Sequence, residues 1–424
     1  MKKFTNARIY RQHDETSEIL VDNGVITQIG KNLPAAGEEI DLRGHLVVPP
    51  YVDPHLHLDY VYTARSEGAS NTSGTLFEGI ARWHDVKKTQ TIEDARERAL
   101  KGIQEEVSRG VQFIRTHIDV TDPNLTGLKA MLEVREQLAD KVTIQIVAFP
   151  QEGMYAYEGG DEMMEEALRM GADCVGGIPH FEWAREIGDK SVHRTVELAV
   201  KHSKLIAVHC DETDDAMSRF VELLNALVMM EGIGARSTAS HTCSFGSADD
   251  AYAYRMMRLF QKSGMNFIAN PTENVYLQGR QDGYPKRRGL TRVKEMWEAG
   301  INVCFGQDSI NDPWYPVGNG NMMNILDHGI HLAQTMSFDE LDRCLDLITY
   351  NGAKTLNVED QYGIDEGKPA SFLVLNADTP FEAVRQRADV LASIRNGEYL
   401  FKRPEPSYDV ELDLLRKVRV SDGD

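Results

Sequence analysis

Short aliphatic segments alternate with turn residues at the two ends of the chain. Segments 18–21 and 25–29 flank an Asn-Gly pair, which is a strong signal for a β-hairpin when it stands between two such segments. The tail repeats the pattern with further aliphatic segments and a second Asn-Gly pair. The two ends therefore predict one small β-sandwich domain made of residues 1–50 and 365–424, with the rest of the chain inserted between its halves.

Between these ends, in residues 51–364, apolar segments of strand length alternate with longer segments of helical periodicity. The candidate strands are 46–52, 111–116, 142–149, 174–178, 205–209, 237–240, 266–270 and 302–305. Helical patterns separate most of them, for example at 94–108, 162–170, 192–201, 216–231 and 292–299. This is the strand count of a (β/α)8 TIM-like barrel. A doubly wound sheet is the alternative, although no GxGxxG motif follows an early strand.

The charge balance narrows the range of partners. The chain has 424 residues, of which 46 are basic and 66 acidic, for a formal net charge of −20. Nucleic acid and anionic membrane surfaces repel such a polyanion, so we expect neither as a partner. No stretch approaches the about 18 apolar residues of a membrane span, and no signal peptide is recognised. Five scattered cysteines form no CxxC pair, so we expect reduced thiols and a cytoplasmic protein.

Polar residues fall where the predicted barrel strands end. They are His55, His57, His117, Gln151, His180, His209, His241 and Asp308. In a barrel, the C-terminal ends of all strands meet on the face that holds the active site. His55 and His57 point the same way on an extended chain and can bind one metal, with His209 as a third ligand. An unpaired acid is costly to bury, which favours Asp308 as a ligand, as a base to the attacking water, or as both.

Two further residues near the strand ends are candidates for the chemistry. Glu212 lies just beyond His209, close to the expected metal but not bound to it, which suits a proton shuttle. The alternative for Glu212 is an acid at a helix N-terminus. His241 is a metal ligand, a hydrogen-bond partner of the attacking water, or a core histidine. The nearest lysine after the fourth predicted strand is Lys190, too distant to help bridge two metals, so we expect a single ion.

Several segments together resemble the amidohydrolase superfamily and, within it, the bacterial cytosine deaminases. The segments Pro54-His55-Leu56-His57, Val208-His209-Cys210-Asp211-Glu212, Ser240-His241 and Asp308 specify only the superfamily. Phe149-Pro150-Gln151-Glu152-Gly153 and Asp312-Pro313-Trp314-Tyr315-Pro316 are more specific to the deaminases. The resemblance covers nearly the whole chain and includes both parts of the small β-domain.

The resemblance implies a role for each matching residue. One divalent ion, Fe²⁺ or Zn²⁺, would be bound by His55, His57, His209 and Asp308. His241 would hold the attacking hydroxide, and Glu212 would protonate the ring nitrogen next to the attacked carbon. Gln151 would recognise the amide edge of the pyrimidine with help from the backbone at Leu76, and Trp314 would line the pocket. The resemblance also implies a homo-oligomer that deaminates a free pyrimidine base.

Two positions depart from the pattern of that family. Cytosine deaminases typically have His-Asp-Asp where this chain has Gln307-Asp308-Ser309. Serine is smaller than aspartate and uncharged, so we hypothesise that the pocket accepts a substituent at ring carbon 5, such as the methyl group of 5-methylcytosine. An amidohydrolase acting on isocytosine, creatinine or an s-triazine is the alternative, and a non-catalytic binding scaffold is the third hypothesis.

Overall fold

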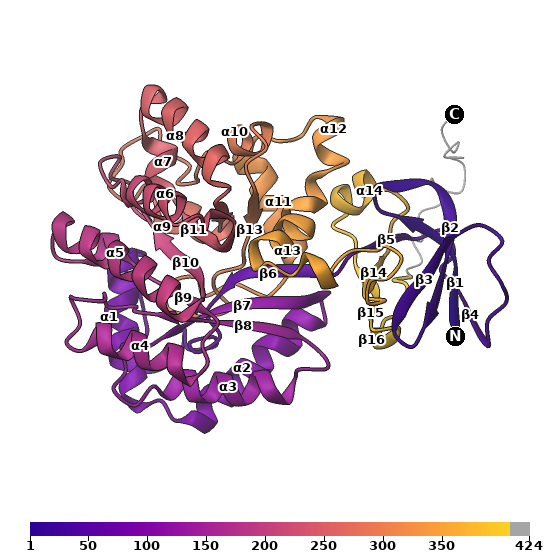
Figure 1. Cartoon of the computed structure of the whole chain (residues 1–424), viewed down its shortest axis with the longest axis horizontal. Helices are drawn as coiled ribbons and strands as arrows, with labels where there is room; N and C mark the ends of the chain where they lie inside the picture. Colours follow the sequence, from indigo (N-terminus) through magenta and orange to yellow (C-terminus); the bar gives the residue numbers. More distant parts are fainter. Residues whose placement is uncertain (408–424) are drawn as a thin grey trace, which may run out of the picture.

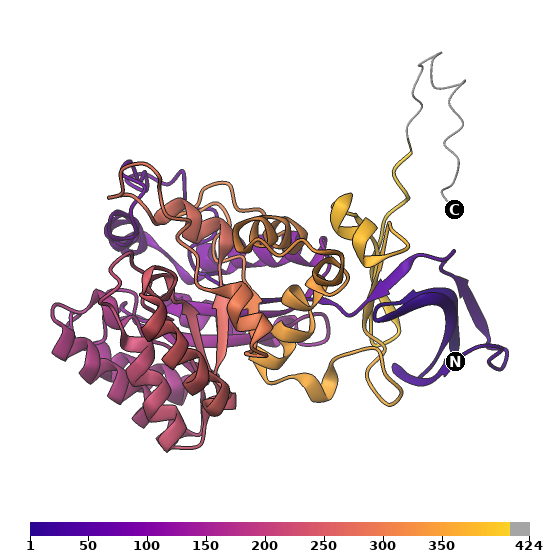
Figure 2. The same ribbon diagram turned by 90° about the horizontal axis from the view of Figure 1, so that it is seen from above.

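The computed structural model describes residues 1–407, so the part of the predicted end domain beyond residue 407 lies outside the described residues. Two eight-stranded sheets organise the chain. Figure 1 shows the smaller unit, built from both chain ends, beside the larger helical unit, and the view from above in Figure 2 keeps the two side by side. No helix within residues 1–407 is both long enough and apolar enough to cross a bilayer.

The first sheet joins the two ends of the chain. Its strands are β1 (Lys2–Ile9), β2 (Gln12–Asp22), β3 (Val25–Gly30), β4 (Glu38–Asp41), β5 (Leu46–Val48), β14 (Phe372–Leu375), β15 (Val390–Arg395) and β16 (Glu398–Lys402). The N-terminal and C-terminal halves meet where β14 pairs antiparallel with β5. Phe4 and Phe372 pack edge to face in the core, with ring centroids 5.0 Å apart. Both Asn-Gly pairs connect neighbouring antiparallel strands, as predicted.

The second sheet is a barrel of parallel strands in sequence order. They are β6 (Tyr51–Leu56), β7 (Val111–Asp119), β8 (Thr143–Phe149), β9 (Cys174–Val175), β10 (Leu205–Cys210), β11 (Ser237–His241), β12 (Asn266–Ala269) and β13 (Val303–Phe305). The ring closes just beyond β13, where the backbone N–H of Asp308 donates to the carbonyl of His55 at 2.8 Å. This confirms the predicted (β/α)8 barrel with a small β-sandwich domain made from both chain ends.

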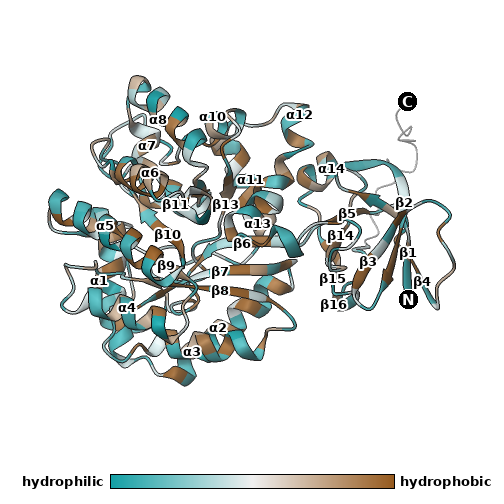
Figure 3. Cartoon of the chain, in the orientation of Figure 1, coloured by the Kyte–Doolittle hydropathy of each residue, from teal (hydrophilic) through white to brown (hydrophobic). Residues whose placement is uncertain are grey.

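Helices follow most of the barrel strands, and most of these helices bury one face. They are α1 (Leu76–Val86), α2 (Ile92–Val107), α3 (Thr126–Gln137), α4 (Gly160–Met170), α5 (Arg185–His202), α6 (Phe220–Met230), α7 (Cys243–Ser247), α8 (Asp250–Ser263), α9 (Pro271–Leu277), α10 (Val293–Glu298), α11 (Met322–Ala333), α12 (Phe338–Leu341), α13 (Tyr350–Leu356) and α14 (Pro380–Arg385). In α8, Asp249 caps the first turn, and the buried residues Ala253, Met256 and Phe260 recur at helical spacing. Figure 3 shows the resulting mixture of hydrophilic and hydrophobic colour on these helices.

Two predicted strands were wrong in their extent. The segment 46–52 is two strands, because Pro49 and Pro50 lack the N–H groups that would continue the ladder. Its first half is β5 of the small sheet, and the barrel begins with β6, which contains His55 instead of ending before it. The segment 174–178 is a strand only at β9, since the chain then turns through two glycines and a short 3-10 helix at Pro179–Phe181.

Candidate metal centre and active site

Three histidines and one aspartate meet inside the mouth of the barrel. Nε2 of His209 lies 3.2 Å from Nε2 of His55 and 3.0 Å from Nε2 of His57. Oδ1 of Asp308 lies 3.4 Å from Nε2 of both His55 and His57. One candidate ligand atom from each of the four residues lies within 4.8 Å of the others, and all four side chains are buried. The structure thus brings together the four residues predicted as metal ligands.

Neighbouring side chains fix the orientation of each imidazole. Nδ1 of His55 lies 2.9 Å from the hydroxyl of Ser240 on β11. The ring of His209 stacks on Phe149, with ring centroids 4.0 Å apart, and the ring of His57 stacks on Tyr60 at 4.6 Å. These contacts aim the Nε2 atoms of all three rings at one point.

The ionisation of this group suits a bound cation. Burial lowers the pKa of His55 and of His209, so their rings are neutral and offer lone pairs. Burial raises the pKa of Asp308, but the nearby His55 and His241 more than offset it and hold that pKa well below its usual range. Neutral imidazole nitrogens and a carboxylate all present lone pairs, which repel one another at short distance. A cation bound between them would remove this repulsion and explain their close packing. The donor set therefore fits a divalent metal.

The backbone at the barrel seam holds Asp308 in place. The carboxyl of Asp53 on β6 accepts from the backbone N–H groups of His55 and Gln307, both at 3.1 Å. Asn270 donates through Nδ2 to Oδ2 of Asp308 at 3.0 Å. Asp308 itself has a left-handed backbone, with φ +67°. Strand β6, the end of β12 and the turn after β13 thus fix this side chain together.

Glu212 and His241 lie beside the four predicted metal ligands. Oε1 of Glu212 is 3.4 Å from Nδ1 of His241, and Oδ2 of Asp308 is 3.8 Å from the same nitrogen. Asn274 on α9 holds that nitrogen from the other side at 3.0 Å. Burial raises the pKa of Glu212 well above its usual value, and the charge of Asp308 adds to the effect. Glu212 is therefore suited to hold and deliver a proton.

The helix-capping alternative for Glu212 does not hold, because its neighbour Asp211 does this work. Oδ1 of Asp211 accepts from the backbone N–H of Phe220 at 3.0 Å, and Oδ2 accepts from that of Val221 at 2.8 Å, both at the start of α6. Asp211 also accepts from the hydroxyl of Ser218 at 2.6 Å. Glu212 is left facing the pocket, where it is only 3% exposed.

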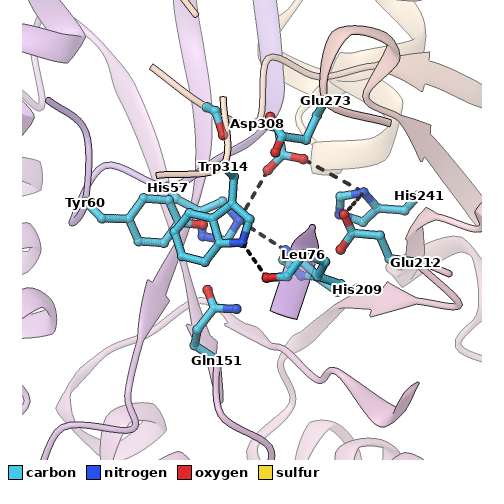
Figure 4. Close-up of a pocket in the computed structure, with 11 residues that line it drawn as sticks. His57, Tyr60, Leu76, Gln151, His209, Glu212, His241, Glu273, Asp308 and Trp314 are labelled. Atoms are coloured by element: carbon cyan, nitrogen blue, oxygen red, sulfur yellow. Dashed lines mark hydrogen bonds and ion pairs between the residues drawn. The ribbon is translucent and has the colours of Figure 1, made fainter. Parts of the chain in front are cut away.

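The pocket above the metal ligands is lined by eleven residues, drawn in Figure 4: His57, Tyr60, Leu76, Gln151, His209, Glu212, His241, Glu273, Asp308, Ser309 and Trp314. Gln151 is 3% exposed, and its Oε1 has no hydrogen-bond partner. Trp314 donates through Nε1 to the carbonyl of Leu76 at 3.2 Å. Trp314 also packs closely against α1, where a Cβ at Gly79 would collide with the indole nitrogen. Every predicted catalytic and substrate-binding residue lines this pocket.

Sequence reasoning missed two residues of the pocket, Tyr60 and Glu273. Glu273 is 2% exposed, and its Oε2 has no hydrogen-bond partner. It follows the predicted strand 266–270 by three residues, as Glu212 follows the strand that ends at His209, so the same spacing argument could have found it. Tyr60 carries no such signal, because a tyrosine beyond a strand is common in any protein core.

Other candidates lie near the pocket without lining it. His117 is on β7, and its ring centroid is 4.0 Å from that of His55; neither of its ring nitrogens has a partner. His180 lies in the short 3-10 helix after β9, where burial lowers its pKa to about 3. Lys190 lies in α5, and its Nζ is 3.8 Å from the ring centre of Tyr155. The side chain of Gln307 donates to the carbonyl of Ser309 at 3.1 Å.

Glu182 holds the loop that carries Gln151. Its Oε1 accepts from the backbone N–H groups of Met154 at 2.7 Å and Tyr155 at 3.1 Å. Its Oε2 accepts from the backbone N–H of Ala156 at 2.8 Å. Glu182 follows β9, so this carboxyl ties the loop after β8 to its neighbour in the barrel.

Comparison with known proteins places the chain in a family. The sequence profile described as amidohydrolase family matches residues 38–401. The chain belongs to the amidohydrolase family. A crystal structure of 5-methylcytosine deaminase from Klebsiella pneumoniae with 5-fluorocytosine bound is 49% identical and superimposes with a TM-score of 0.94; the match covers 96% of this chain and 99% of that one. This agrees with the family resemblance seen in the sequence.

More distant relatives act on other compounds, as their names state. An N-isopropylammelide isopropyl amidohydrolase from Pseudomonas is 28% identical over 369 residues, which cover 86% of this amidohydrolase and 88% of the relative. A pterin deaminase from Rhizobium rhizogenes is 27% identical over 407 residues, covering 94% and 90% of the two chains.

Proposed function

We propose that this amidohydrolase hydrolytically deaminates a free cytosine-type base, cytosine or a 5-substituted cytosine such as 5-methylcytosine. The products are the uracil- or thymine-type base and ammonia. The observation that carries the proposal is the 49% identity to a 5-methylcytosine deaminase over 96% of the chain. The pocket supports it, because it combines a candidate metal centre with a buried acid and a free amide side chain.

The metal would be one divalent ion, Fe²⁺ or Zn²⁺, held by His55, His57, His209 and Asp308. Such an ion lowers the pKa of bound water from about 15.7 to about 7, which supplies a nucleophile at neutral pH. His241 hydrogen-bonds the attacking water and orients it toward the ring. Asp308 takes a proton from this water and passes it to the departing nitrogen, because its carboxyl lies between the ligand histidines and His241.

Glu212 handles the proton on the ring. Attack at the amidine carbon leaves the adjacent ring nitrogen with excess negative charge, which must be neutralised as the tetrahedral centre forms. Burial raises the pKa of Glu212 well above its usual value, which favours the protonated form that can donate this proton. Water is consumed, the bond to the exocyclic nitrogen breaks, and ammonia leaves. As the new carbonyl group forms, its hydroxyl proton returns to Glu212, which restores the acid for the next turnover.

The remaining walls orient the base. The side-chain amide of Gln151 and the carbonyl of Leu76 hydrogen-bond the amide edge of the pyrimidine, and the indole of Trp314 covers the ring. Ser309 faces ring carbon 5. A serine leaves room for a methyl group there and brings no charge into a pocket that already holds three acids.

Turnover of cytosine and 5-methylcytosine tests this proposal. We expect ammonia release from 5-methylcytosine, and we expect Ser309→Asp to lower its kcat/KM at least about tenfold relative to cytosine, since one methylene in a pocket is worth about 1–3 kcal/mol. Ser309→Ala is the matched control and should keep the preference. A Ser309→Asp enzyme with full activity on 5-methylcytosine would refute the hypothesis that Ser309 makes room for the methyl group at ring carbon 5.

The same assay separates the alternatives. Isocytosine, creatinine and an s-triazine belong in the substrate panel as the alternative substrates, and N-isopropylammelide joins them because one relative is named for it. Turnover of one of these and none of cytosine would replace the proposed substrate class. Metal content without any turnover would favour a binding scaffold.

We further propose that the enzyme works in the cytoplasm as a homo-oligomer without nucleic acid. Its five cysteines are all buried and unpaired, which suits a reducing compartment. The net charge of −20 opposes binding to nucleic acid. Light scattering of the purified protein would give the number of subunits.

A further inference from the structure

Glu273 is an acid in the pocket that the proposed mechanism does not use. It lies in the first turns of α9, directly after β12, and is 2% exposed. The neighbouring Asn274 fixes this turn, because it contacts both His241 and the backbone N–H of Asn270. A buried carboxyl oxygen without a donor is costly, and Oε2 of Glu273 has none. A donor on the substrate would satisfy it.

The neighbours of Glu273 indicate which part of the substrate it faces. Its carboxyl interacts with the side chain of Ser309 and lies within the electrostatic reach of Asp308 and Glu212. Figure 4 shows Glu273 beside Asp308, on the opposite side of the pocket from Gln151. With Glu212 at the ring nitrogen and Ser309 at ring carbon 5, the position between them is the attacked carbon and its exocyclic amino group.

We propose that Glu273 accepts a hydrogen bond from the exocyclic amino group of the base and thereby restricts the enzyme to substrates with an N–H on the leaving nitrogen. This inference rests on the proposed function and names a specificity-determining residue for it. The carboxyl holds an acceptor oxygen in either protonation state, so recognition does not depend on its titration. As the bond from the ring carbon to this nitrogen breaks, the same oxygen stays in contact with the ammonia that forms.

The test compares two substitutions of similar size. Glu273→Gln keeps an acceptor oxygen, and Glu273→Met fills the same space without one. The substrates are cytosine and its 4-dimethylamino analogue, which has no N–H on the exocyclic nitrogen. We expect wild type and Glu273→Gln to prefer cytosine at least about tenfold in kcat/KM, and Glu273→Met to lose about tenfold on cytosine while its preference falls toward one.

Two controls keep the result interpretable. The same change at the exposed Glu298 of α10, Glu298→Met, should leave both substrates unaffected. Replacing a buried acid that has an unpaired oxygen by methionine should not lower stability. If the Glu273→Met variant does not fold, Glu273→Leu replaces it in the comparison. A preference that is identical in Glu273→Gln and Glu273→Met, or an equal loss on both substrates, would overturn the inference.

Binding experiments separate this inference from the proposed function. Calorimetric dissociation constants for cytosine and the dimethylamino analogue can be measured in the Glu212→Gln background, where turnover is expected to be about 10²- to 10⁴-fold slower. If wild type releases no ammonia, the proposed function fails; a binding preference that still depends on Glu273 would then support only its contact with the exocyclic N–H group, not a role in the choice of substrate for deamination. If wild type deaminates cytosine and the preference ignores Glu273, only the inference fails.

Discussion

Replacing Glu182 by glutamine should weaken substrate binding, although Glu182 does not line the pocket. Glu182 is 8% exposed and accepts three backbone N–H groups from residues 154–156, at 2.7, 3.1 and 2.8 Å. This loop begins at Gln151, the residue proposed to bind the amide edge of the base. A glutamine has the same shape but presents only one acceptor oxygen, so it cannot satisfy both ends of the loop.

The geometry gives the size of the effect. In the Glu182→Gln variant, the amide oxygen can keep the two N–H groups of Met154 and Tyr155, because both bind the same carboxyl oxygen in the wild type. The amide nitrogen then faces the N–H of Ala156, so one hydrogen bond is lost and a buried donor is left unsatisfied. The loop loses roughly 2–3 kcal/mol, about 1 for the bond and about 1–2 for the unpaired donor.

Steady-state kinetics on the best base should show this as a change in KM. Gln151 is proposed to contact the substrate both before and during the reaction, so we expect KM to rise about tenfold or more and kcat to change by less than about threefold. Glu186→Gln is the matched control, since Glu186 lies exposed at the start of α5. A Glu182→Gln enzyme with an unchanged KM and a lower unfolding temperature would show that Glu182 serves stability alone and would refute the reasoning.

Three further predictions concern the metal, the proton donor and a buried ion pair. Chelation should abolish activity and lower the unfolding temperature, because a ligand at about 100 times its Kd stabilises the fold by about 2.7 kcal/mol; activity that persists after metal analysis shows an empty protein would contradict this. Glu212→Gln should lower kcat about 10²- to 10⁴-fold with little change in KM, measured by ammonia release. Lys87→Met should lower the free energy of unfolding by about 3–5 kcal/mol in urea at pH 7, because Nζ of Lys87 lies 2.8 Å from buried Asp119 and 2.5 Å from Glu152. Burial raises the pKa of Asp119, but Lys87 and Thr121 outweigh it and hold that pKa below its usual value, so its stabilising contribution is complete above the unfolded pKa of about 3.9 and is lost below it. The difference in unfolding free energy between wild type and Lys87→Met should therefore stay constant from pH 7 to about 4 and narrow as the pH falls further toward about 3. A difference that does not narrow below about pH 4 would count against this pair.

The barrel was predictable because its signals are local. Each strand is a short apolar segment, and each helix buries residues at a 3.6-residue spacing, so both can be read from a window of the chain. The ligand set was predictable for a second reason, since parallel strands in a barrel bring their C-terminal ends to one face. The prediction of one strand at 46–52 was wrong because this apolar segment contributes to two sheets. Only the pairing partners of Val48 and Tyr51 show that they belong to different sheets.

The contacts that join distant segments across the barrel were not predictable from the sequence. Glu182 binds a loop 26–28 residues earlier, and no pattern around either segment marks the contact. The role proposed for Glu273 depends on its neighbours Ser309, Asp308 and Glu212, which lie on other strands and loops. Such roles depend on which strands become neighbours, and that is settled by the closed ring as a whole.

Backbone conformation at the strand ends explains why the proposed catalytic side chains converge. His241 and Asp308 end β11 and follow β13, and both have a left-handed backbone with φ +67°. A non-glycine residue in this region costs about 1–2 kcal/mol, and no sequence pattern calls for it at a histidine. The cost is offset by contacts that need this geometry: Asn274 at His241, and the bond from the backbone N–H of Asp308 to His55 that closes the barrel. Along an extended strand, neighbouring side chains point to opposite faces of the sheet. The left-handed backbone at these two positions departs from this alternation and directs the side chains of His241 and Asp308 into the pocket. A substitution that relieved this backbone strain would stabilise the fold at the expense of the site.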